Sequence, residues 1–293
     1  MTLTSFHLKI IALTTMFIDH LGAVFSEYFG FGFRIIGRVA FPIFICLVAE
    51  GFKHTKSPEK FLLRLGIFAV LSEPAFDWAI RGIQLPPSFS FAEFHLNVFL
   101  NSLWASVDFF NNTNIFYTLF LGGMAIYAFK MAQKEASGHG LTINMFPHPQ
   151  YNFRLGKERA PNKINAAMAY FAAITCVLGF MWVAESMLTT DYGAYGVAFI
   201  FLMYVIKPLK LRLAVMAVMC VFQHRYLVWW TIQHLCFNTP PVPGISLLMI
   251  PATLVPVLLV AFYNGKRGPS FKWFFYSAYP LHLFIFALAA KTF

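Results

Sequence analysis

Residues 8–25 read LKIIALTTMFIDHLGAVF, an apolar segment long enough to cross a bilayer that nevertheless carries Asp19 and His20 near its centre. Counting about 1.5 Å of helix rise per residue, His20 lies about 16 Å beyond Lys9. That depth is close to the midplane of a hydrocarbon core about 30 Å thick. A charged group there costs about 2.5–3.5 kcal/mol, so the Asp-His pair predicts a membrane helix with a functional polar position.

The composition of the whole chain agrees with a membrane protein. Of its 293 residues 59% are hydrophobic and 12% are charged, whereas a soluble domain carries about 25% charged residues. The chain has too few polar residues to cover a soluble surface, and lipid-facing helices need no polar cover. Composition therefore excludes a soluble or disordered protein and predicts an all-α, polytopic membrane protein.

Apolar runs of membrane-spanning length recur along the chain and predict about nine transmembrane helices. They lie near residues 8–26, 34–53, 61–81, 114–131, 164–185, 192–207, 211–234, 244–263 and 273–291. Lys9 precedes the first run, and clusters of Lys and Arg follow every second run. By the positive-inside rule the N-terminus is cytoplasmic and the C-terminus is outside.

Two segments interrupt this pattern within what we expect to be a single domain, residues 1–293. Residues 84–113 contain prolines and an Asn-Asn-Thr patch around a short apolar stretch, which predicts an outer-face loop with an interfacial or re-entrant piece. Residues 132–163 are the polar stretch of the chain and are expected to form a cytoplasmic loop.

The net charge of +10 follows the loops of this topology, so it does not indicate nucleic-acid binding. The cysteines show neither CxxC nor Cys/His spacing, and the sequence predicts small buried hydrophobic residues, not a disulfide framework or a metal site. These are Cys46, Cys176, Cys220 and Cys236.

Further ionisable residues fall at the depth of His20. His282 lies about 15 Å beyond Lys272, and Glu73 about 18 Å into the third run, which predicts a shared polar cavity. Arg38 and Asp77 have matched depths on neighbouring antiparallel runs, and we expect them to form a buried ion pair.

Residues near the cytoplasmic side and in the last run are further candidates for binding or for shaping the site. The sequence Asn264-Gly-Lys266-Arg267-Gly offers backbone amides and two cations to a phosphate group, although it also fits an ordinary positive-inside turn. Glu50 lies close to Lys53 and fits an interface residue. In the last run Pro280 predicts a kink beside His282, with Tyr279 on the same side.

Several blocks together resemble the TraX family. They are LKIIALTTMFIDHLGAVF (8–25), RIIGRVAFPIFICLVAEGFKHT (34–55), LLRLGIFAVLSEPAFD (62–77), NIFYTLFLGG (114–123), TDYGAYG (190–196), YNGKRG (263–268) and KWFFYSAYPLHL (272–283). The resemblance implies a multi-pass inner-membrane acetyltransferase, typified by N-terminal acetylation of pilin. The family is also similar to the wider group of transmembrane acyltransferases, which take acetyl groups from cytoplasmic acetyl-CoA and deliver them to an extracytoplasmic acceptor. For this chain that acceptor would be a pilin-like amine or a surface glycan.

These features define the expected site. The catalytic residues are Asp19, His20 and His282, with His20 favoured as the proton-handling residue and a carboxylate as its orienting group. The resemblance in the second block also implies a role for Arg34. The residues expected to bind the acceptor are Arg38, Glu50, Glu73, Asp77, Asp191, Tyr192 and Tyr279, and those expected to bind acetyl-CoA are Lys53, Asn264, Lys266 and Arg267.

A second reading of the same residues comes from another class of protein. Asp19, His20 and Glu73 could serve as the proton-coupling groups of a secondary transporter. The midplane cluster fits both readings, and the ordered blocks favour the enzyme. Acetyl-CoA hydrolysis or labelling by the purified protein separates the two.

Overall fold

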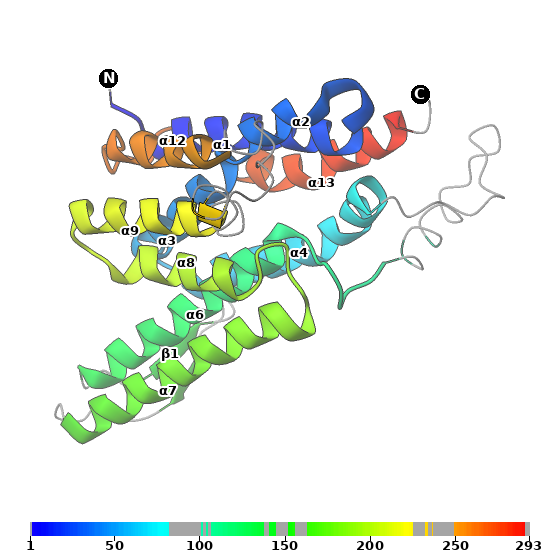
Figure 1. The fold of residues 1–293 in the computed structure, drawn as a ribbon. Helices are drawn as coiled ribbons and strands as arrows, with labels where there is room; N and C mark the ends of the chain where they lie inside the picture. Colours follow the sequence, from blue (N-terminus) through cyan, green and yellow to red (C-terminus); the bar gives the residue numbers. More distant parts are fainter. Residues whose placement is uncertain are drawn as a thin grey trace. The chain divides into compact units, whose positions relative to one another are not determined.

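The fold is described from a computed structural model, which covers residues 2–81, 107–137, 141–144, 152–155, 163–224 and 249–290, with residues 101, 104, 232, 233 and 236 in addition. Apart from one two-stranded hairpin, the elements over these residues are helices (Figure 1). Each of the nine predicted apolar runs overlaps at least one of the helices. Most of the outer-face loop expected at residues 84–113 lies outside the described residues.

The chain divides into two compact units, which we describe separately. The first unit comprises Met1–Leu47, Ser72–Val107 and Ile206–Phe293, and the second comprises Val48–Leu71 and Asp108–Val205. The helices of the first unit are α1 (Ser5–Val24), α2 (Ser26–Gly37), the start of α3 (Ala40–His54), the end of α4 (Pro58–Ile80), α9 (Leu209–Phe222), α12 (Met249–Ala261) and α13 (Lys272–Ala289).

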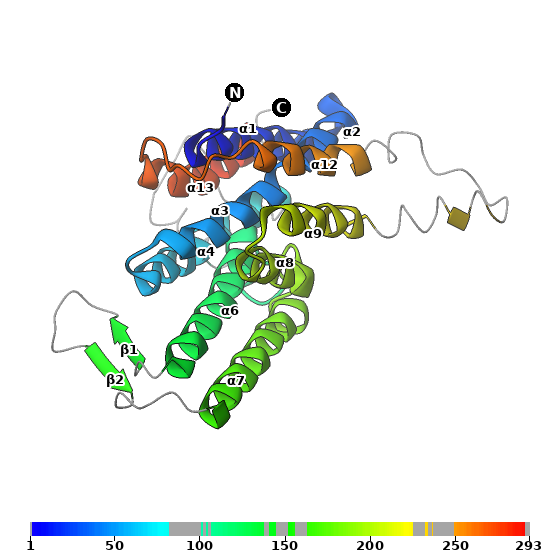
Figure 2. The ribbon, with the colours of Figure 1, turned by 90° about the vertical axis from the view of Figure 1, so that its left-hand side faces the viewer.

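In the first unit α1 is the central element, packed against α2 on one side and α13 on another (Figure 2). Its N-terminus is fixed by a capping box in which the side chains of Thr4 and His7 bond to each other's backbone amides. Such a cap satisfies donors that the first helical turn leaves unpaired. Buried Leu8 and Ala12 of α1 then pack with Ile43 of α3, which orients the helix.

The predicted second run forms two helices. α2 ends at Gly37 and α3 begins at Ala40, with a tight turn between them in which the amides of Arg38 and Val39 bond to Ile35 and Ile36. This break places Arg38 at a point where the helical ladder is interrupted. Breaks inside membrane helices are tolerated where side chains or cavities satisfy the backbone.

The second unit is built on α6 (Ile115–Ala136), α7 (Lys163–Trp182) and α8 (Gly193–Val205), with the ends of α3 and α4 that belong to it. A π-helical segment, η2 (Val183–Met187), extends α7. The core of this unit is small and apolar, with Leu121 and Ala125 of α6 packed against Val177 and Val197.

The loop predicted at residues 132–163 contains the hairpin. Strand β1 (Leu141–Asn144) pairs antiparallel with β2 (Asn152–Leu155), with Leu141 opposite Leu155. The prediction of a purely α-helical chain did not include this element. Both strands do alternate apolar and polar residues, as Leu-Thr-Ile-Asn and Asn-Phe-Arg-Leu, which is the strand pattern at its shortest informative length.

Over the residues that the structure describes, four helical stretches are long and apolar enough to cross a membrane: Ser5–Val24, Phe31–His54 (which runs through the α2–α3 turn), Ile115–Ala136 and Lys163–Met187. The membrane character predicted from composition is therefore supported. The prediction of buried cysteines is confirmed for Cys46 and Cys220 but wrong for Cys176 and Cys236, which are exposed.

Candidate active site

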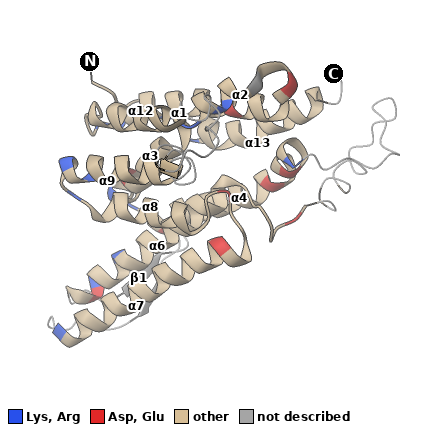
Figure 3. Cartoon of the chain, viewed as in Figure 1, with Lys and Arg blue, Asp and Glu red and all other residues tan. Residues whose placement is uncertain are grey.

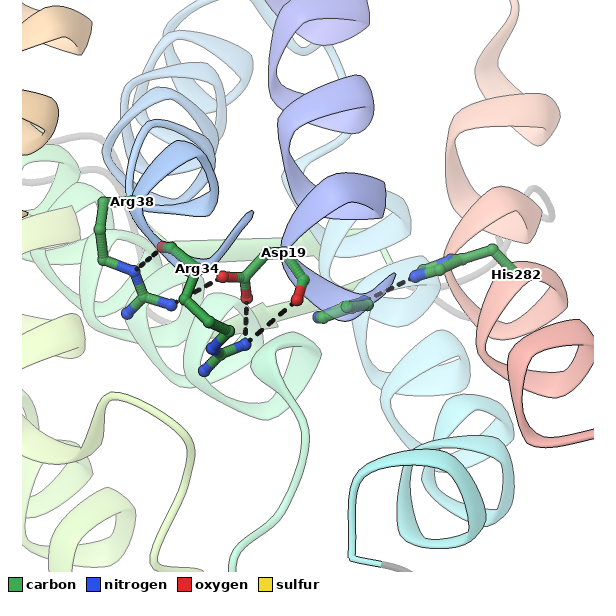
Figure 4. A network of polar contacts seen from close by, with 5 residues as sticks. Asp19, Arg34, Arg38 and His282 are labelled. Atoms are coloured by element: carbon green, nitrogen blue, oxygen red, sulfur yellow. Dashed lines mark hydrogen bonds and ion pairs between the residues drawn. The ribbon is translucent and has the colours of Figure 1, made fainter. Parts of the chain in front are cut away.

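Asp19 is held between two arginines of the neighbouring helix (Figure 4). Arg34 Nη1 donates to Asp19 Oδ2 at 2.7 Å, and Arg38 Nη2 donates to Asp19 Oδ1 at 2.9 Å. Arg38 also donates from Nε to the carbonyl of Arg34 at 3.0 Å, which satisfies backbone at the α2–α3 break. One carboxylate thus fixes two cations, and we call these three residues the Asp19 clamp.

The clamp forms because α1 and α2 approach each other closely. A Cβ added to Gly37 would collide with the carboxylate and Cβ of Asp19, and one added to Gly22 would lie 2.6 Å from Phe33 Cβ. Glycine at these two positions lets the helices meet without side chains between them. The backbone of α2 therefore serves as one wall of the Asp19 position.

His20, the next residue along α1, points to a different neighbour. Its Nδ1 lies 2.6 Å from Nε2 of His282 on α13, although the two residues are 262 positions apart. The rings are parallel, with 4.9 Å between centroids and 3° between planes. These two histidines, which were expected to line one cavity, are thus in direct contact.

The hydrogen bonds fix where the protons of this pair lie when both rings are neutral. His282 Nδ1 is 2.7 Å from the carbonyl oxygen of Ala278, which can only accept, so Nδ1 carries the proton. Nε2 of His282 must then accept, and Nδ1 of His20 donates to it. The remaining lone pair is on Nε2 of His20, for which no described residue supplies a hydrogen-bond partner.

Aromatic side chains surround the pair. The ring of Phe17 stacks on that of His282, with 4.2 Å between ring centroids. The ring of Tyr279 lies edge-on to both imidazoles, with centroid distances of 5.8 Å to His20 and 5.7 Å to His282. Phe286 is also edge-on to His282, with 5.4 Å between centroids. His282 is 5% exposed and Tyr279 is 3% exposed. His282 therefore sits in a low-dielectric environment, where charges act over longer distances than in water, and His20 is part-buried beside it.

The Asp19 clamp and the histidine pair lie on two sides of α1 (Figure 4). Arg34 and Arg38 still act electrostatically on His20. Asp19, however, binds the arginines, and the group that orients the pair is the Ala278 carbonyl. The geometry therefore differs from the prediction that a carboxylate orients the catalytic imidazole.

The carboxylates of α4 lie in the same unit as the histidines. Glu73 is 0% exposed and Asp77 is 1% exposed. Asp77 accepts from Arg81 Nη1 at 3.0 Å, and Arg38 binds Asp19. Asp77 is thus paired with Arg81, and Arg38 is paired with Asp19. A direct ion pair between Arg38 and Asp77 stays a prediction.

The loop expected to bind phosphate is tied to the start of α1. The carbonyls of Lys266 and Arg267 accept from the amides of Ser5 and Phe6, at 2.9 and 3.1 Å. The amide of Asn264 donates to the Leu3 carbonyl, and that of Lys266 donates to the side chain of Asn264. These two amides are not available to a ligand, so a phosphate would meet the exposed side chains of Lys266 and Arg267.

The other predicted binding residues belong to the second unit. Lys53 Nζ lies 2.9 Å from Glu50 Oε1, so the two form an ion pair within α3. Asp191 is exposed, and its amide donates to the carbonyl of Thr113 at 3.0 Å. Tyr192 follows it, directly before α8. The binding roles of these residues stay predictions.

His224 is the residue that sequence reasoning missed. It follows the end of α9 and is 9% exposed, with no hydrogen-bond partner for Nε2 among the described residues. Its position in a long apolar run was the signal that could have singled it out. Among the described residues no group of three or more His, Cys, Asp or Glu side chains is arranged to hold a metal.

Comparisons with known proteins agree with the resemblance. The family model described as TraX protein matches residues 5–290. A curated protein of Dichelobacter nodosus, "Probable fimbrial assembly protein FimC, serogroup H1", is 25% identical over 304 residues, covering 99% of this chain and 96% of its own. No solved structure matches the chain. With nearly its whole length matched and its helices of membrane-spanning length, the chain is a membrane protein that belongs to the TraX family.

Proposed function

We propose that this protein is an inner-membrane acetyltransferase that moves an acetyl group from cytoplasmic acetyl-CoA to an N-terminal amine of an extracytoplasmic polypeptide. The observation that carries the proposal is the part-buried histidine pair, whose bonding leaves one basic nitrogen, Nε2 of His20. A general base needs such a lone pair within reach of the reacting group. The similarity to a protein named for fimbrial assembly favours a polypeptide acceptor over a glycan.

In the proposed reaction the neutral acceptor amine attacks the thioester carbonyl carbon of acetyl-CoA. A carbon–nitrogen bond forms, the carbon–sulfur bond breaks, and the amine proton moves to Nε2 of His20. The proton then passes to the departing CoA thiolate, which leaves as the thiol. His282 holds His20 in the tautomer that accepts this proton.

The clamp arginines suit the charge that develops during this step. Negative charge builds on the thioester oxygen as the amine attacks, and fixed cations in a low-dielectric site stabilise it. Arg34 and Arg38 are held in place by Asp19 and act electrostatically on His20. Asp19 thereby contributes by fixing the arginines.

The donor would enter from the side where Lys and Arg gather. Lys266 and Arg267 are exposed, and Lys9 lies near them, over the ring of Phe275 at 5.4 Å. Side-chain cations of this kind bind phosphate oxygens. With nine spans and a cytoplasmic N-terminus, these residues face the compartment that contains acetyl-CoA.

The experiment uses the purified full-length protein in lipid nanodiscs, with acetyl-labelled acetyl-CoA and a peptide with a free N-terminus. His20→Ala should lower transfer by about 10²–10⁴, the usual contribution of a general base. Lys266→Ala and Arg267→Ala should raise the KM for acetyl-CoA with kcat unchanged. His54→Ala is the matched control, because its side chain is 69% exposed.

Two results would refute the enzyme. One is full transfer by His20→Ala, and the other is a wild-type protein that neither transfers nor hydrolyses the acetyl group. In the second case, His20-dependent proton flux in sealed vesicles would favour the transporter, because a hydrogen-bonded imidazole pair can also relay protons.

A further inference from the structure

His224 and its neighbour Gln223 present two buried polar atoms without partners. Among the described residues neither Nε2 of His224 nor Oε1 of Gln223 has a hydrogen-bond partner. Leaving such an atom unpaired costs about 1–3 kcal/mol. Buried polar atoms of native proteins are almost always paired, so an orphan of this kind needs an explanation, and a ligand is one.

A contact between α3 and α9 lies in the same unit as His224 and the Asp19 clamp. Cys46 Sγ of α3 lies 3.6 Å from Met216 Sδ of α9. Arg38 lies eight residues before Cys46, on the far side of the α2–α3 turn, and His224 lies eight residues after Met216, just beyond the end of α9.

Arg38 acts electrostatically on His224 as well as on His20. The Arg38 guanidinium is therefore the common neighbour of two imidazoles, the base of the proposed reaction and a second histidine with an unpaired nitrogen.

We propose that His224 and Gln223 bind the first peptide group of the acceptor polypeptide, with His224 Nε2 donating to its carbonyl oxygen and Gln223 Oε1 accepting from its N–H. The inference rests on the proposed function and names the part of the acceptor that is recognised. A peptide group carries one acceptor and one donor, which is the complement of these two atoms. The nearby cation favours the partial negative charge of a carbonyl oxygen.

The test measures the acceptor KM, kcat and donor hydrolysis for wild type, His224→Phe and His224→Gln in nanodiscs. The Phe variant keeps ring volume and removes the nitrogens, while Gln restores a donor. His224→Phe should raise the acceptor KM about tenfold, equivalent to one hydrogen bond, and leave acetyl-CoA hydrolysis unchanged. His224→Gln should recover much of this loss, and His54→Phe should behave as wild type.

A peptide whose first amide is reduced to CH₂–NH provides the second arm. Wild type should bind this analogue about tenfold more weakly than the normal peptide, and His224→Phe should no longer distinguish the two. Direct binding of both peptides without acetyl-CoA tests recognition even if no transfer occurs, which separates failure of this inference from failure of the proposed function.

Three results would overturn the peptide site. They are an unchanged acceptor KM in His224→Phe, an equal fall in hydrolysis and transfer, and an amino-sugar acceptor that shows the same dependence on His224. The first indicates that water occupies the site, the second indicates a structural role, and the third indicates a glycan acceptor.

Discussion

At the scale of single residues, the Asp19 carboxylate determines where two cations lie. Its two oxygens accept from Arg34 and Arg38, and the side chain of Arg38 is 15% exposed. A cation this far from water needs its partner, and removing one member of a buried pair leaves an uncompensated charge. The clamp is thus required for the bundle to hold positive charge near His20.

The narrow gap between α1 and α2 leads to a stability prediction. Gly37→Ala should destabilise the protein by about 1–3 kcal/mol, because the new methyl group would overlap the Asp19 carboxylate. Gly32→Ala is the matched control, since it lies in the same helix with nothing within 4 Å of its Cβ. It should be neutral or stabilise by up to about 1 kcal/mol. Thermal unfolding in detergent measures both, and equal midpoints would contradict the close contact.

At the scale of elements, the start of α1 and the loop before α13 behave as one piece. Leu3 pairs with Tyr263 in a short parallel bridge, and the amides of Ser5 and Phe6 donate to the loop. Because α1 also carries Asp19 and His20, the loop that bears Lys266 and Arg267 is attached to the helix that bears the proposed base.

Two glycines of this loop allow that attachment to be tested. Gly265 and Gly268 both have positive φ, at 74° and 72°, so alanine is strained at either position. Only at Gly268 would a Cβ also meet the N-terminal segment, at 2.8 Å from Thr4 Oγ1. Gly268→Ala should therefore speed amide hydrogen exchange at Ser5 and Phe6 beyond the change in Gly265→Ala. Identical exchange in the two variants would mean that the loop and α1 are not joined as described.

The same elements show what sequence could and could not predict. Apolar length located the helices, and equal depth from the interface brought His20 and His282 together, because helix rise is nearly constant. The break at Arg38 was not predicted, although Pro42 marks it, because a proline cannot bond the carbonyl four residues before it, here that of Arg38. His224 was missed for another reason, because its significance lies in its unpaired nitrogen and its neighbour Arg38, and both depend on tertiary packing.

At the scale of the whole molecule, charge is distributed unevenly along each unit. In the second unit Lys130, Lys134 and Lys163 lie at the end where α6 finishes and α7 begins, whereas Glu185 lies at the far end of α7 (Figure 3). In the first unit Lys9 of α1 lies near Arg267. Arg267 belongs to the loop that is hydrogen-bonded to the start of α1. Each unit thus has a cationic end, as the positive-inside rule requires of a bundle with one cytoplasmic face.

This asymmetry predicts the topology of the chain. Green fluorescent protein inserted after Ser137 should fluoresce, because that position follows the basic end of α6 and is expected in the cytoplasm. Alkaline phosphatase fused after Phe293 should be active, because an odd number of spans places the C-terminus outside. Exchanging the two reporters supplies the control, since each should then be inactive. A fluorescent C-terminal fusion would remove the nine-span arrangement, and it would also reverse α13, so that Lys272 could no longer share the cytoplasmic face with Lys9.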